Sequence, residues 1–289
     1  MLPAHGDSNA YFFYNILIRE DNHHGSMSWR LLSDYNSDVY ANLALDEALA
    51  KTDLGEKNTL NTIRFWQSNR AVVIGRFQCV HKEVDLDYCQ ENEISIARRF
   101  TGGGAVFHDL GNMNFSLRLH QSHDYVPRGL KELYHVFIGI ITKSLNSLDI
   151  PAKFDPMGSC IRIHGKKISG TAGWIKQGIS FIHGTLLLDA DLDMLQKSLH
   201  PPEVQQVYLR DRTRIRCMES KKDTVTNLKQ EVEDCPTQKD IKSAIIRNLE
   251  ELVGVKIKER HSTREEKHTA QALYDSQYSK PSWNLGTPA

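Results

Sequence analysis

The sequence contains no long apolar run, no excess of charge of either sign and no closely spaced pair of cysteines. The missing apolar run excludes a membrane-spanning helix, which needs about 20 such residues. The balanced charge, formally +0 at pH 7, provides no attraction to nucleic acid or to a membrane surface. We therefore expect a soluble, cytoplasmic protein that binds neither nucleic acid nor membrane.

The cysteines are few and scattered, with an odd total and no Cys-x-x-Cys spacing. Zinc sites use closely spaced cysteines, and the disulfide frameworks of small secreted domains use an even number of them. The pattern therefore predicts reduced thiols throughout. The residues are Cys79, Cys89, Cys160, Cys217 and Cys235.

The N-terminal arm, residues 1–26, lacks the basic segment that precedes the apolar patch of a secretory signal. A His-His-Gly-Ser stretch ends this arm just before Met27, which indicates either a cloning remnant or a second start site. We leave the arm out of the fold prediction and expect it to be poorly ordered. Residues 27–289 are predicted to form one domain.

Segments with strand-like and helix-like patterns alternate irregularly after Met27. Runs of β-branched and aromatic residues predict strands, and apolar residues at helical spacing predict helices. The predicted strands cover residues 29–32, 62–66, 71–75, 95–98, 114–119, 179–183 and 185–188, with a hairpin at 160–168. The predicted helices cover residues 39–51, 86–93, 130–148 and 239–252. Because strict βαβ repeats are missing, we expect an α+β fold on a mixed or antiparallel β-sheet with flanking helices.

Residues 98–109 read Arg-Arg-Phe-Thr-Gly-Gly-Gly-Ala-Val-Phe-His-Asp and follow a predicted strand. Three glycines without Cβ atoms let the backbone approach a ligand and present N–H groups to an anion. The two preceding arginines are permanent charges suited to phosphate or carboxylate. The Walker and dinucleotide-binding patterns do not occur here. The segment therefore predicts an anion cradle, and the alternative is a tight hairpin with two solvated arginines.

Two further segments place polar side chains beside small residues. Residues 165–172 read Gly-Lys-Lys-Ile-Ser-Gly-Thr-Ala, and a lysine there can neutralise a phosphate and a carboxyl oxygen together. The alternative is a pair of turn lysines that face water. Residues 183–187 read His-Gly-Thr-Leu-Leu, where the histidine either joins a site or forms a local structural hydrogen bond.

In this order and spacing, the three segments resemble the lipoate–protein ligase A family. The resemblance extends to residues 40–47, 73–78, 225–228 and 283–286, so it covers the chain from Met27 to the C terminus. It implies an α+β fold related to biotin–protein ligases. It also implies an enzyme that converts lipoate and ATP to lipoyl-AMP and then transfers the lipoyl group to a protein lysine.

By the same resemblance, Lys167 is the catalytic lysine that contacts both the lipoyl carbonyl and the phosphate. The implied nucleotide and lipoyl-AMP site comprises Arg99, Gly102, Gly103, Gly104, Ala105, Val106, Phe107, His108 and Lys167. The assigned tunnel for the lipoyl chain comprises Val73, Gly75, Arg76, Phe77 and His183. ATP and Mg²⁺ are the implied cofactors and lipoate is the substrate, with no metal ligands assigned.

The alternative functions are an octanoyltransferase or lipoyltransferase that uses a preformed acyl donor, and a non-catalytic homologue that binds lipoate or lipoyl-AMP. Octanoyltransferases of this fold transfer acyl groups through a cysteine without ATP, and the two places where they carry it hold Ile179-Ser180 and Lys153 here. This difference favours ATP chemistry. Cys160 stands where the ligases commonly have an aspartate, so it is either a small buried residue or an unusual nucleophile.

The chain ends three residues after Gly286, where larger family members continue with an accessory domain. It therefore resembles the catalytic half of the bipartite ligases, which need a small separate accessory protein for efficient adenylation. We expect the chain alone to use preformed lipoyl-AMP well and to make it poorly. The implied acceptors are lipoyl domains of 2-oxoacid dehydrogenase E2 and the glycine-cleavage H protein.

Overall fold

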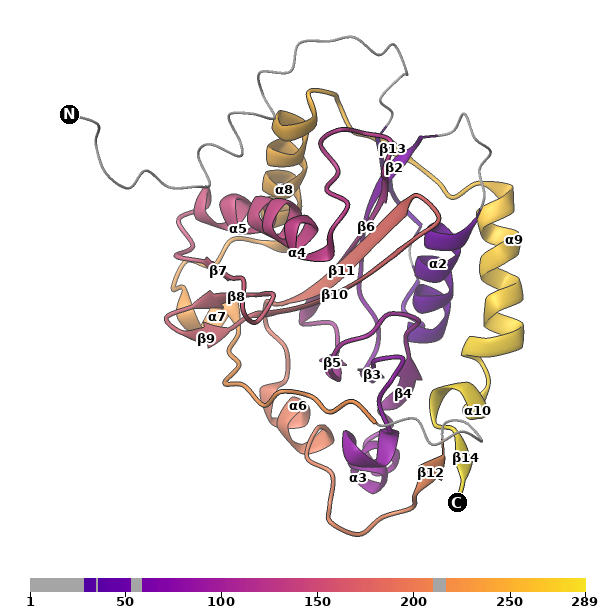
Figure 1. Cartoon of the computed structure of the whole chain (residues 1–289). Helices are drawn as coiled ribbons and strands as arrows, with labels where there is room; N and C mark the ends of the chain where they lie inside the picture. The colour runs from indigo at the N-terminus through magenta and orange to yellow at the C-terminus, as the bar shows by residue number, and fades with distance from the viewer. Residues whose placement is uncertain (1–28, 35, 53–58, 210–216) are drawn as a thin grey trace, which may run out of the picture.

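A computed structural model describes residues 29–34, 36–52, 59–209 and 217–289 (Figure 1). Its largest element is a six-stranded sheet with the strand order β10-β11-β6-β2-β1-β13. In that order the strands span Ser169–Lys176, Ile179–Leu187, Asn112–His120, Asn61–Trp66, Trp29–Leu32 and Lys258–Arg260. The pairings from β10 to β2 are antiparallel and those from β2 to β13 are parallel, so the sheet is mixed.

Helices cover both faces of this sheet (Figure 1). One face lies under α5 (Gly139–Asn146) and α8 (Gln238–Val253), and the other lies under α2 (Val39–Lys51) and α9 (Arg264–Leu273). Every second side chain of β6 joins the apolar core under α5 and α8. These residues are Met113, Phe115, Leu117 and Leu119. Because side chains alternate across a strand, the remaining residues of β6 face α2 and α9.

The face under α2 and α9 is held by buried ion pairs. Arg64 of β2 donates to Asp46 of α2 at 2.8 Å. Arg30 of β1 pairs with Glu266 of α9, whose carboxylate also accepts the backbone N–H of Thr263 and so caps the helix. Removing one partner of such a pair leaves an unpaired buried charge and costs about 3–5 kcal/mol. The two pairs therefore fix both helices on the sheet.

A second sheet of three short strands carries the glycine-rich segment. Its order is β4-β3-β5, with β4 at Ser95–Arg98, β3 at Ala71–Ile74 and β5 at Val106–His108. All four residues of β3 are buried, as expected for a continuous apolar run in a central strand. β3 is parallel to β4 and antiparallel to β5. The connection between the outer strands therefore crosses the C-terminal end of β3. We call this connection, residues 99–105, the glycine loop.

The third sheet contains β7 (Lys153–Asp155), β8 (Cys160–Ile163) and β9 (Lys166–Lys167). The turn between β8 and β9, residues 164–165, has φ angles of 48° and 81°, as a two-residue type I′ turn requires. Its register pairs Arg162 with Lys167 and Asp155 with Cys160. Register partners project to the same face, so these four side chains share one face. We call residues 160–167 the lysine hairpin.

The remaining elements connect or flank these sheets. They are η1 (Val80–Lys82), α3 (Leu86–Glu91), α4 (Leu130–Leu133), the π-helical η2 (Tyr134–Ile138), α6 (Leu192–Ser198), α7 (Leu228–Glu231), the π-helical η3 (Tyr274–Tyr278), α10 (Pro281–Asn284) and the paired strands β12 (Tyr208–Leu209) and β14 (Thr287–Pro288). Capping boxes at Thr237 and Thr263 explain where α8 and α9 begin. Within the ranges given above, no helix is long and apolar enough to cross a membrane.

The predicted α+β class, with a mixed sheet and flanking helices, is confirmed. The helix predicted at residues 130–148 is a continuous run through α4, η2 and α5, and the strands predicted at 179–183 and 185–188 are the single strand β11. The sequence patterns do not predict α9, because Glu266 is its one buried residue and an ion pair rather than an apolar stripe attaches it. The arm at residues 1–26 lies outside the described residues.

The cysteines differ from the prediction. Cys79 and Cys217 form a disulfide with Cα atoms 5.5 Å apart, although 138 positions separate them in the sequence. The prediction of reduced thiols is therefore wrong for this pair, because contact between distant segments leaves no spacing pattern to detect. Cys89, Cys160 and Cys235 are not disulfide-bonded, as predicted.

Candidate active site

The glycine loop packs backbone to backbone against the turn that follows β3, residues 75–79, which we call the β3 turn. A Cβ atom on Gly75 would lie 2.1 Å from the carbonyl oxygen of Gly103, so only glycine fits there. Gly103 itself has a φ of +88°, a conformation that favours glycine. The N–H of Arg76 donates to the carbonyl of Thr101 at 2.8 Å. Close packing and this hydrogen bond fix the two segments together.

Arg99 lies beneath the glycine loop and is 4% exposed. Its guanidinium donates to the carbonyl oxygens of Gly102 and Gly104, at 2.7 Å each. A further bond of 3.0 Å reaches the carbonyl of Val73 in β3. No carboxylate among the described residues pairs with Arg99. Burial lowers the pKa of Arg99 to about 10, so the guanidinium stays charged at neutral pH. A positive charge therefore lies beneath the loop.

Arg98 is also buried and holds the β3 turn. It donates to the carbonyls of Gly75 and Gln78 at 3.1 and 2.7 Å. Its Nε donates to the carbonyl of Trp283 at 2.8 Å, which ties β4 to the C-terminal region. The alternative of two solvated arginines is therefore wrong. Both side chains shape the loops through backbone carbonyls, and direct contact of Arg99 with a ligand phosphate stays a prediction.

Two neutral histidines flank this buried charge. The Nε2 atom of His183 in β11 shares a 2.7 Å hydrogen bond with Oγ1 of Thr101. His108 of β5 is buried edge-on against Trp66, with ring centroids 5.4 Å apart. Burial and, secondly, the charge of Arg99 lower the pKa of His108 to about 3 and that of His183 well below 6.5. Both rings are therefore neutral at physiological pH, and His183 is the one whose ring takes part in the hydrogen bond given above.

The five residues assigned to a lipoyl tunnel have different surroundings. Phe77 is 41% exposed and lies beside Gly102, whose ideal Cβ position is 3.7 Å from the ring. The Val73 side chain is buried in a core cluster, and the Arg76 guanidinium stacks 5.6 Å from the Trp283 ring centroid. Phe77, Gly75 and His183 are thus brought to the glycine loop, whereas the side chains of Val73 and Arg76 are engaged elsewhere.

The predicted nucleotide site continues from the glycine loop into β5. A Cβ atom on Gly170 would lie 3.6 Å from Val106 and 3.9 Å from Cε of Lys167, so these three residues lie together. This proximity joins the lysine hairpin to the end of the glycine loop. The Phe107 side chain is buried in the core beside β3, so only its backbone can reach a ligand.

The two lysines of the hairpin have opposite surroundings. Lys166 faces the surface, where its Nζ lies 2.8 Å from Oε1 of Glu231. Lys167 has no hydrogen-bond or ion-pair partner for its Nζ among the described residues. Its backbone is fixed, because its N–H donates to the carbonyl of Thr224 at 2.8 Å and its carbonyl accepts from Thr226 at 3.0 Å. The alternative of a turn lysine that faces water is therefore correct for Lys166 but not for Lys167. The ammonium of Lys167 is unpaired, and the strand that carries it is fixed.

Arg162 lies across the lysine hairpin from Lys167 and bridges two carboxylates. It donates to Asp155 at 2.8 Å and, through two nitrogens, to Asp223 at 2.9 and 2.7 Å. These hydrogen bonds hold the pKa of both carboxyls below the usual range. Cys160 is 0% exposed, and burial raises the pKa of its thiol. A buried thiol with a raised pKa is a poor nucleophile, so Cys160 fits the reading of a small buried residue.

The described part of the chain contains no group of three His, Cys, Asp or Glu side chains spaced to hold a metal ion. Asp155 and Asp223 are nevertheless ionised carboxylates on the face of the lysine hairpin. Mg²⁺ at nucleotide sites is commonly held by one or two carboxylates together with substrate phosphates. The two carboxylates fit that mode of binding, which needs no cage made by the protein alone.

Comparison with known proteins identifies the family. The lipoyl protein ligase A/B catalytic domain matches residues 38–250. Lipoate-protein ligase A subunit 1 of Thermoplasma acidophilum is 32% identical over 266 residues, covering 89% of this chain and 95% of that protein. Probable lipoate-protein ligase A of Mycoplasma pneumoniae is 35% identical over 184 residues, covering 63% of this chain and 52% of that protein. The chain therefore belongs to the lipoyl protein ligase A/B catalytic domain family, as the sequence motifs predict.

Solved structures with the same fold carry the ligands expected of this family. A T. acidophilum lipoate ligase structure with bound lipoic acid has a TM-score of 0.76 and 30% identity, covering 90% of this chain and 100% of that chain. Lipoate-protein ligase A bound with ATP has a TM-score of 0.74 and 31% identity, covering 90% and 99%. A bipartite T. acidophilum ligase, described with its E2 lipoyl domain, has a TM-score of 0.73 and 31% identity, covering 90% and 97%. These likenesses confirm the ligase fold.

Several residues of the site carry no clear signal in the sequence. Ser220 accepts the N–H of Ala105 at 2.8 Å, although no motif marks it. Asp155 and Asp223 are likewise isolated acidic residues in the sequence. Arg162 could have been found, because a two-residue turn at residues 164–165 places it opposite Lys167. The geometry of this turn is therefore the signal in the sequence that could have identified Arg162 as a site residue.

Proposed function

We propose that the chain is the catalytic subunit of a lipoate–protein ligase. The carboxylate of lipoate attacks the α-phosphorus of ATP, pyrophosphate leaves, and lipoyl-AMP forms. The ε-amine of an acceptor lysine then attacks the acyl carbon, AMP leaves, and the new amide nitrogen loses one proton. Relatives solved with lipoic acid and with ATP support both substrates.

The single observation that carries this proposal is the unpaired ammonium of Lys167. It lies beside Gly170 and Val106, at the point where the lysine hairpin meets the end of the glycine loop. Negative charge increases on phosphate oxygens in the first step and on the acyl oxygen in the second. A positioned ammonium lowers the free energy of both transition states. An acyl phosphate between the hairpin and the loop would contact Lys167 throughout.

The glycine loop would bind the phosphate part of this ligand through its backbone N–H groups. Arg99 supports this role, because it draws the carbonyls of Gly102 and Gly104 toward itself and away from an incoming anion. Its charge has no carboxylate partner among the described residues and adds a favourable field for phosphate. His183 and Thr101 would supply neutral hydrogen bonds on the same side of the loop.

Mg²⁺ would be brought by ATP and held by Asp155 and Asp223, and it would neutralise charge on the phosphate oxygens. Arg162 keeps both carboxylates ionised and in place through its hydrogen bonds. The positively charged pair of Arg162 and Lys167 would then face the phosphates from the hairpin. Both residues project to the same face of the sheet.

The acceptor lysine would belong to a lipoyl domain of 2-oxoacid dehydrogenase E2 or to the glycine-cleavage H protein. Likeness to the bipartite ligase described with its E2 lipoyl domain supports this acceptor. Similarity to a protein named subunit 1 supports a small separate accessory protein that assists adenylation. The chain alone would then transfer efficiently from preformed lipoyl-AMP.

One observation favours a second candidate, a cysteine-based acyl transferase. Cys160 lies near Lys167 and Arg162, whose charges lower the pKa of the thiol. Burial is the larger effect and raises that pKa, so the thiol stays protonated. The places where octanoyltransferases carry their cysteine hold Ile179-Ser180 and Lys153, so neither has a thiol. The balance favours adenylate chemistry.

Mass spectrometry of a lipoyl-domain acceptor tests the proposal. The chain is incubated with lipoate and Mg-ATP, with lipoyl-AMP, or with octanoyl carrier protein without ATP. We expect rapid lipoylation from lipoyl-AMP and slow lipoylation that depends on ATP and releases pyrophosphate. Octanoylation without ATP would instead identify a transferase. Binding of lipoyl-AMP without any transfer would identify a non-catalytic homologue.

A further inference from the structure

A segment from far along the sequence, residues 217–220, lies against the glycine loop. The hydroxyl oxygen of Ser220 accepts the N–H of Ala105 at 2.8 Å and a side-chain N–H of Gln78 at 3.0 Å. A Cβ atom on Gly104 would lie 2.8 Å from the same oxygen, so Ser220 is in contact with that glycine. The hydroxyl therefore occupies a backbone donor that a phosphate oxygen would use.

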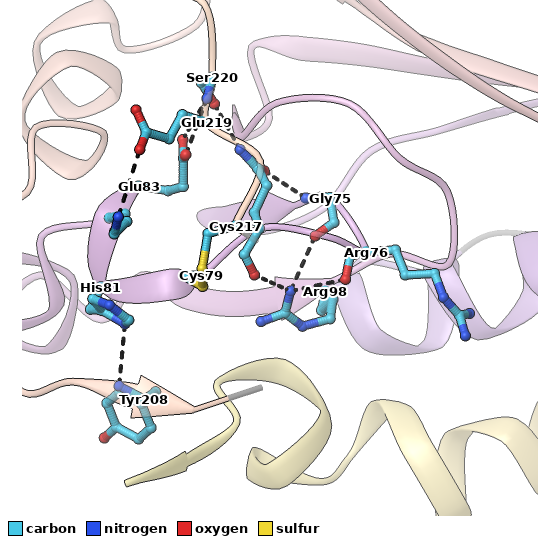
Figure 2. The surroundings of a disulfide bond; sticks show 12 residues. Gly75, Arg76, Cys79, His81, Glu83, Arg98, Tyr208, Cys217, Glu219 and Ser220 are labelled. Atoms are coloured by element: carbon cyan, nitrogen blue, oxygen red, sulfur yellow. Dashed lines mark hydrogen bonds and ion pairs between the residues drawn. A yellow bond between two sulfur atoms is a disulfide. The ribbon is translucent and has the colours of Figure 1, made fainter. Parts of the chain in front are cut away.

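The disulfide attaches this segment to the β3 turn. Cys217 is bonded to Cys79, the last residue of the β3 turn, and Figure 2 shows the bond beside Gly75 and Arg98. The other attachments are hydrogen bonds and one exposed ion pair, in which Nζ of Lys82 lies 3.7 Å from Oε1 of Glu219. Met218 donates its N–H to the carbonyl of Phe77 at 3.0 Å, and Ser220 donates its N–H to the Glu83 carboxylate at 3.1 Å. One covalent bond and a few exchangeable contacts thus hold the segment on the loop.

We propose that Cys79 and Cys217 are a redox-reversible modification site that controls access of the nucleotide phosphates to the glycine loop. In the oxidised protein the disulfide keeps Ser220 on the Ala105 amide and the phosphates are excluded from that donor. In the reduced protein the segment can leave and the donor becomes available. This inference rests on the proposed function, because the phosphates belong to ATP or lipoyl-AMP.

The Cys79–Cys217 disulfide determines whether Ser220 or a phosphate oxygen occupies the N–H of Ala105. An ionised phosphate oxygen accepts a stronger hydrogen bond from an amide than a neutral hydroxyl does. Without the disulfide, phosphate displaces a segment that only hydrogen bonds and one exposed ion pair retain. With the disulfide, the segment stays near the amide at a high effective concentration, and the same phosphate must compete with it continuously. The oxidised state is therefore the weaker binder of nucleotide.

The redox step needs a dithiol reductant such as dithiothreitol or a dithiol protein. A thiolate of the reductant attacks one sulfur of the Cys79–Cys217 bond, and the second reductant thiol resolves the mixed disulfide. Two electrons pass to the protein, which gains two protons and two thiols, while the reductant becomes its own disulfide. Oxidation reverses the exchange. The Cα separation of 5.5 Å lies within the usual disulfide range, so the bond can re-form without moving the backbone.

Titration calorimetry of the full chain with ATP, before and after dithiothreitol, tests the inference. We expect reduction to tighten ATP binding at least about five-fold, an effect in the usual range of coupling between sites. Cys217→Ser should bind like the reduced protein under both conditions. Cys235→Ser is the matched control, because this free cysteine packs against the apolar core under α5 and α8 and the variant should keep the full response. Equal ATP affinity in oxidised and reduced wild-type protein overturns the inference.

A second measurement follows the segment without any ligand. Lys221 and Lys222 are exposed beside Ser220, so mass spectrometry of tryptic peptides reports cleavage after them. We expect faster cleavage there after reduction and in Cys217→Ser. Equal cleavage rates in both redox states overturn the inference, whatever ATP does. Absence of ATP and lipoyl-AMP binding in both states would instead overturn the proposed function.

Discussion

The glycine loop and the lysine hairpin form two sides of one site but are held in different ways. In the glycine loop the carbonyls of Gly102 and Gly104 are held by the Arg99 guanidinium, which also donates to the carbonyl of Val73 in β3. In the lysine hairpin the backbone is fixed, but the ammonium of Lys167 has no partner among the described residues. The loop therefore holds its dipoles in place before a ligand binds, whereas the hairpin keeps one charge available for it.

This difference separates stability from activity. A buried guanidinium that satisfies several carbonyls contributes to folding, and its loss leaves those carbonyls unpaired. An unpaired, half-exposed lysine contributes little to folding, so its loss affects ligand binding and chemistry. Substitutions in the loop should therefore lower the free energy of unfolding, and substitutions in the hairpin should lower the rate. The following predictions test this contrast.

The largest effect is expected for Lys167→Ala. Transfer of the lipoyl group from lipoyl-AMP to a lipoyl domain should slow about 10³-fold, as removal of one oxyanion-stabilising group does at other sites. The unfolding midpoint in urea should stay near that of the wild type. Lys166→Ala is the matched control, because its Nζ pairs with Glu231 at the surface, and its rate should be near normal. Equal losses in the two variants would remove the distinction between the lysines.

Arg99→Leu should lower the free energy of unfolding by about 2–4 kcal/mol, because several buried carbonyls lose their donor. Urea denaturation followed by circular dichroism measures this loss. Arg70→Leu, at an exposed position, should change stability by less than about 0.5 kcal/mol. An Arg99→Leu variant as stable as Arg70→Leu would show that the loop is not held from beneath.

The buried His108 predicts a pH dependence of stability. Its folded-state pKa of about 3 lies below the unfolded value of 6.5, so the unfolded chain binds the proton first as the pH falls. The resulting stability is present above pH 6.5 and is lost progressively toward pH 3. Between pH 7 and pH 5 the wild type should lose about 2 kcal/mol more than His108→Gln. Urea unfolding measures the free energy of unfolding of both proteins at both pH values. An equal loss between pH 7 and pH 5 in the wild type and in His108→Gln would contradict this.

The smallest effect is expected for Arg162→Ala, which releases Asp155 and Asp223 beside Lys167. The transfer rate should fall about ten-fold, equivalent to about 1.4 kcal/mol. Stability should change by less than about 1 kcal/mol, because the bridge is partly exposed and screened by solvent. Arg162→Lys should recover part of the rate, since it retains a charge but not the two-sided geometry. A larger effect on stability than on rate would show that Arg162 mainly supports the fold, as Arg98 and Arg99 do.

Much of the fold could be predicted because it depends on local patterns. The α2 helix and the β1 and β4 strands have the predicted bounds, since apolar periodicity determines them. The α9 helix was missed because its attachment is the ion pair of Glu266 with Arg30, two residues far apart in the sequence. Long-range pairing of this kind leaves no periodic pattern.

The site shows the same division. The motifs predicted the glycine loop and Lys167, and the turn at residues 164–165 contained enough information to find Arg162. They did not distinguish an arginine that meets a ligand from one that supports a loop, because that depends on the direction of a buried side chain. They also did not predict the pairing of Cys79 with Cys217 or the contact of Ser220 with the loop. These contacts exist only once distant segments have folded together.

The central claim is that the acyl phosphate binds between two groups. The ammonium of Lys167 contacts it from one side, and the backbone N–H groups of the fixed glycine loop contact it from the other. The most direct test is a crystal structure of the reduced chain with a non-hydrolysable lipoyl-AMP analogue. We expect Nζ of Lys167 within about 3 Å of the acyl carbonyl or phosphate oxygen, with backbone N–H groups of the glycine loop on the phosphate. An analogue bound with Lys167 pointing into solvent, or bound away from the glycine loop, would contradict the account.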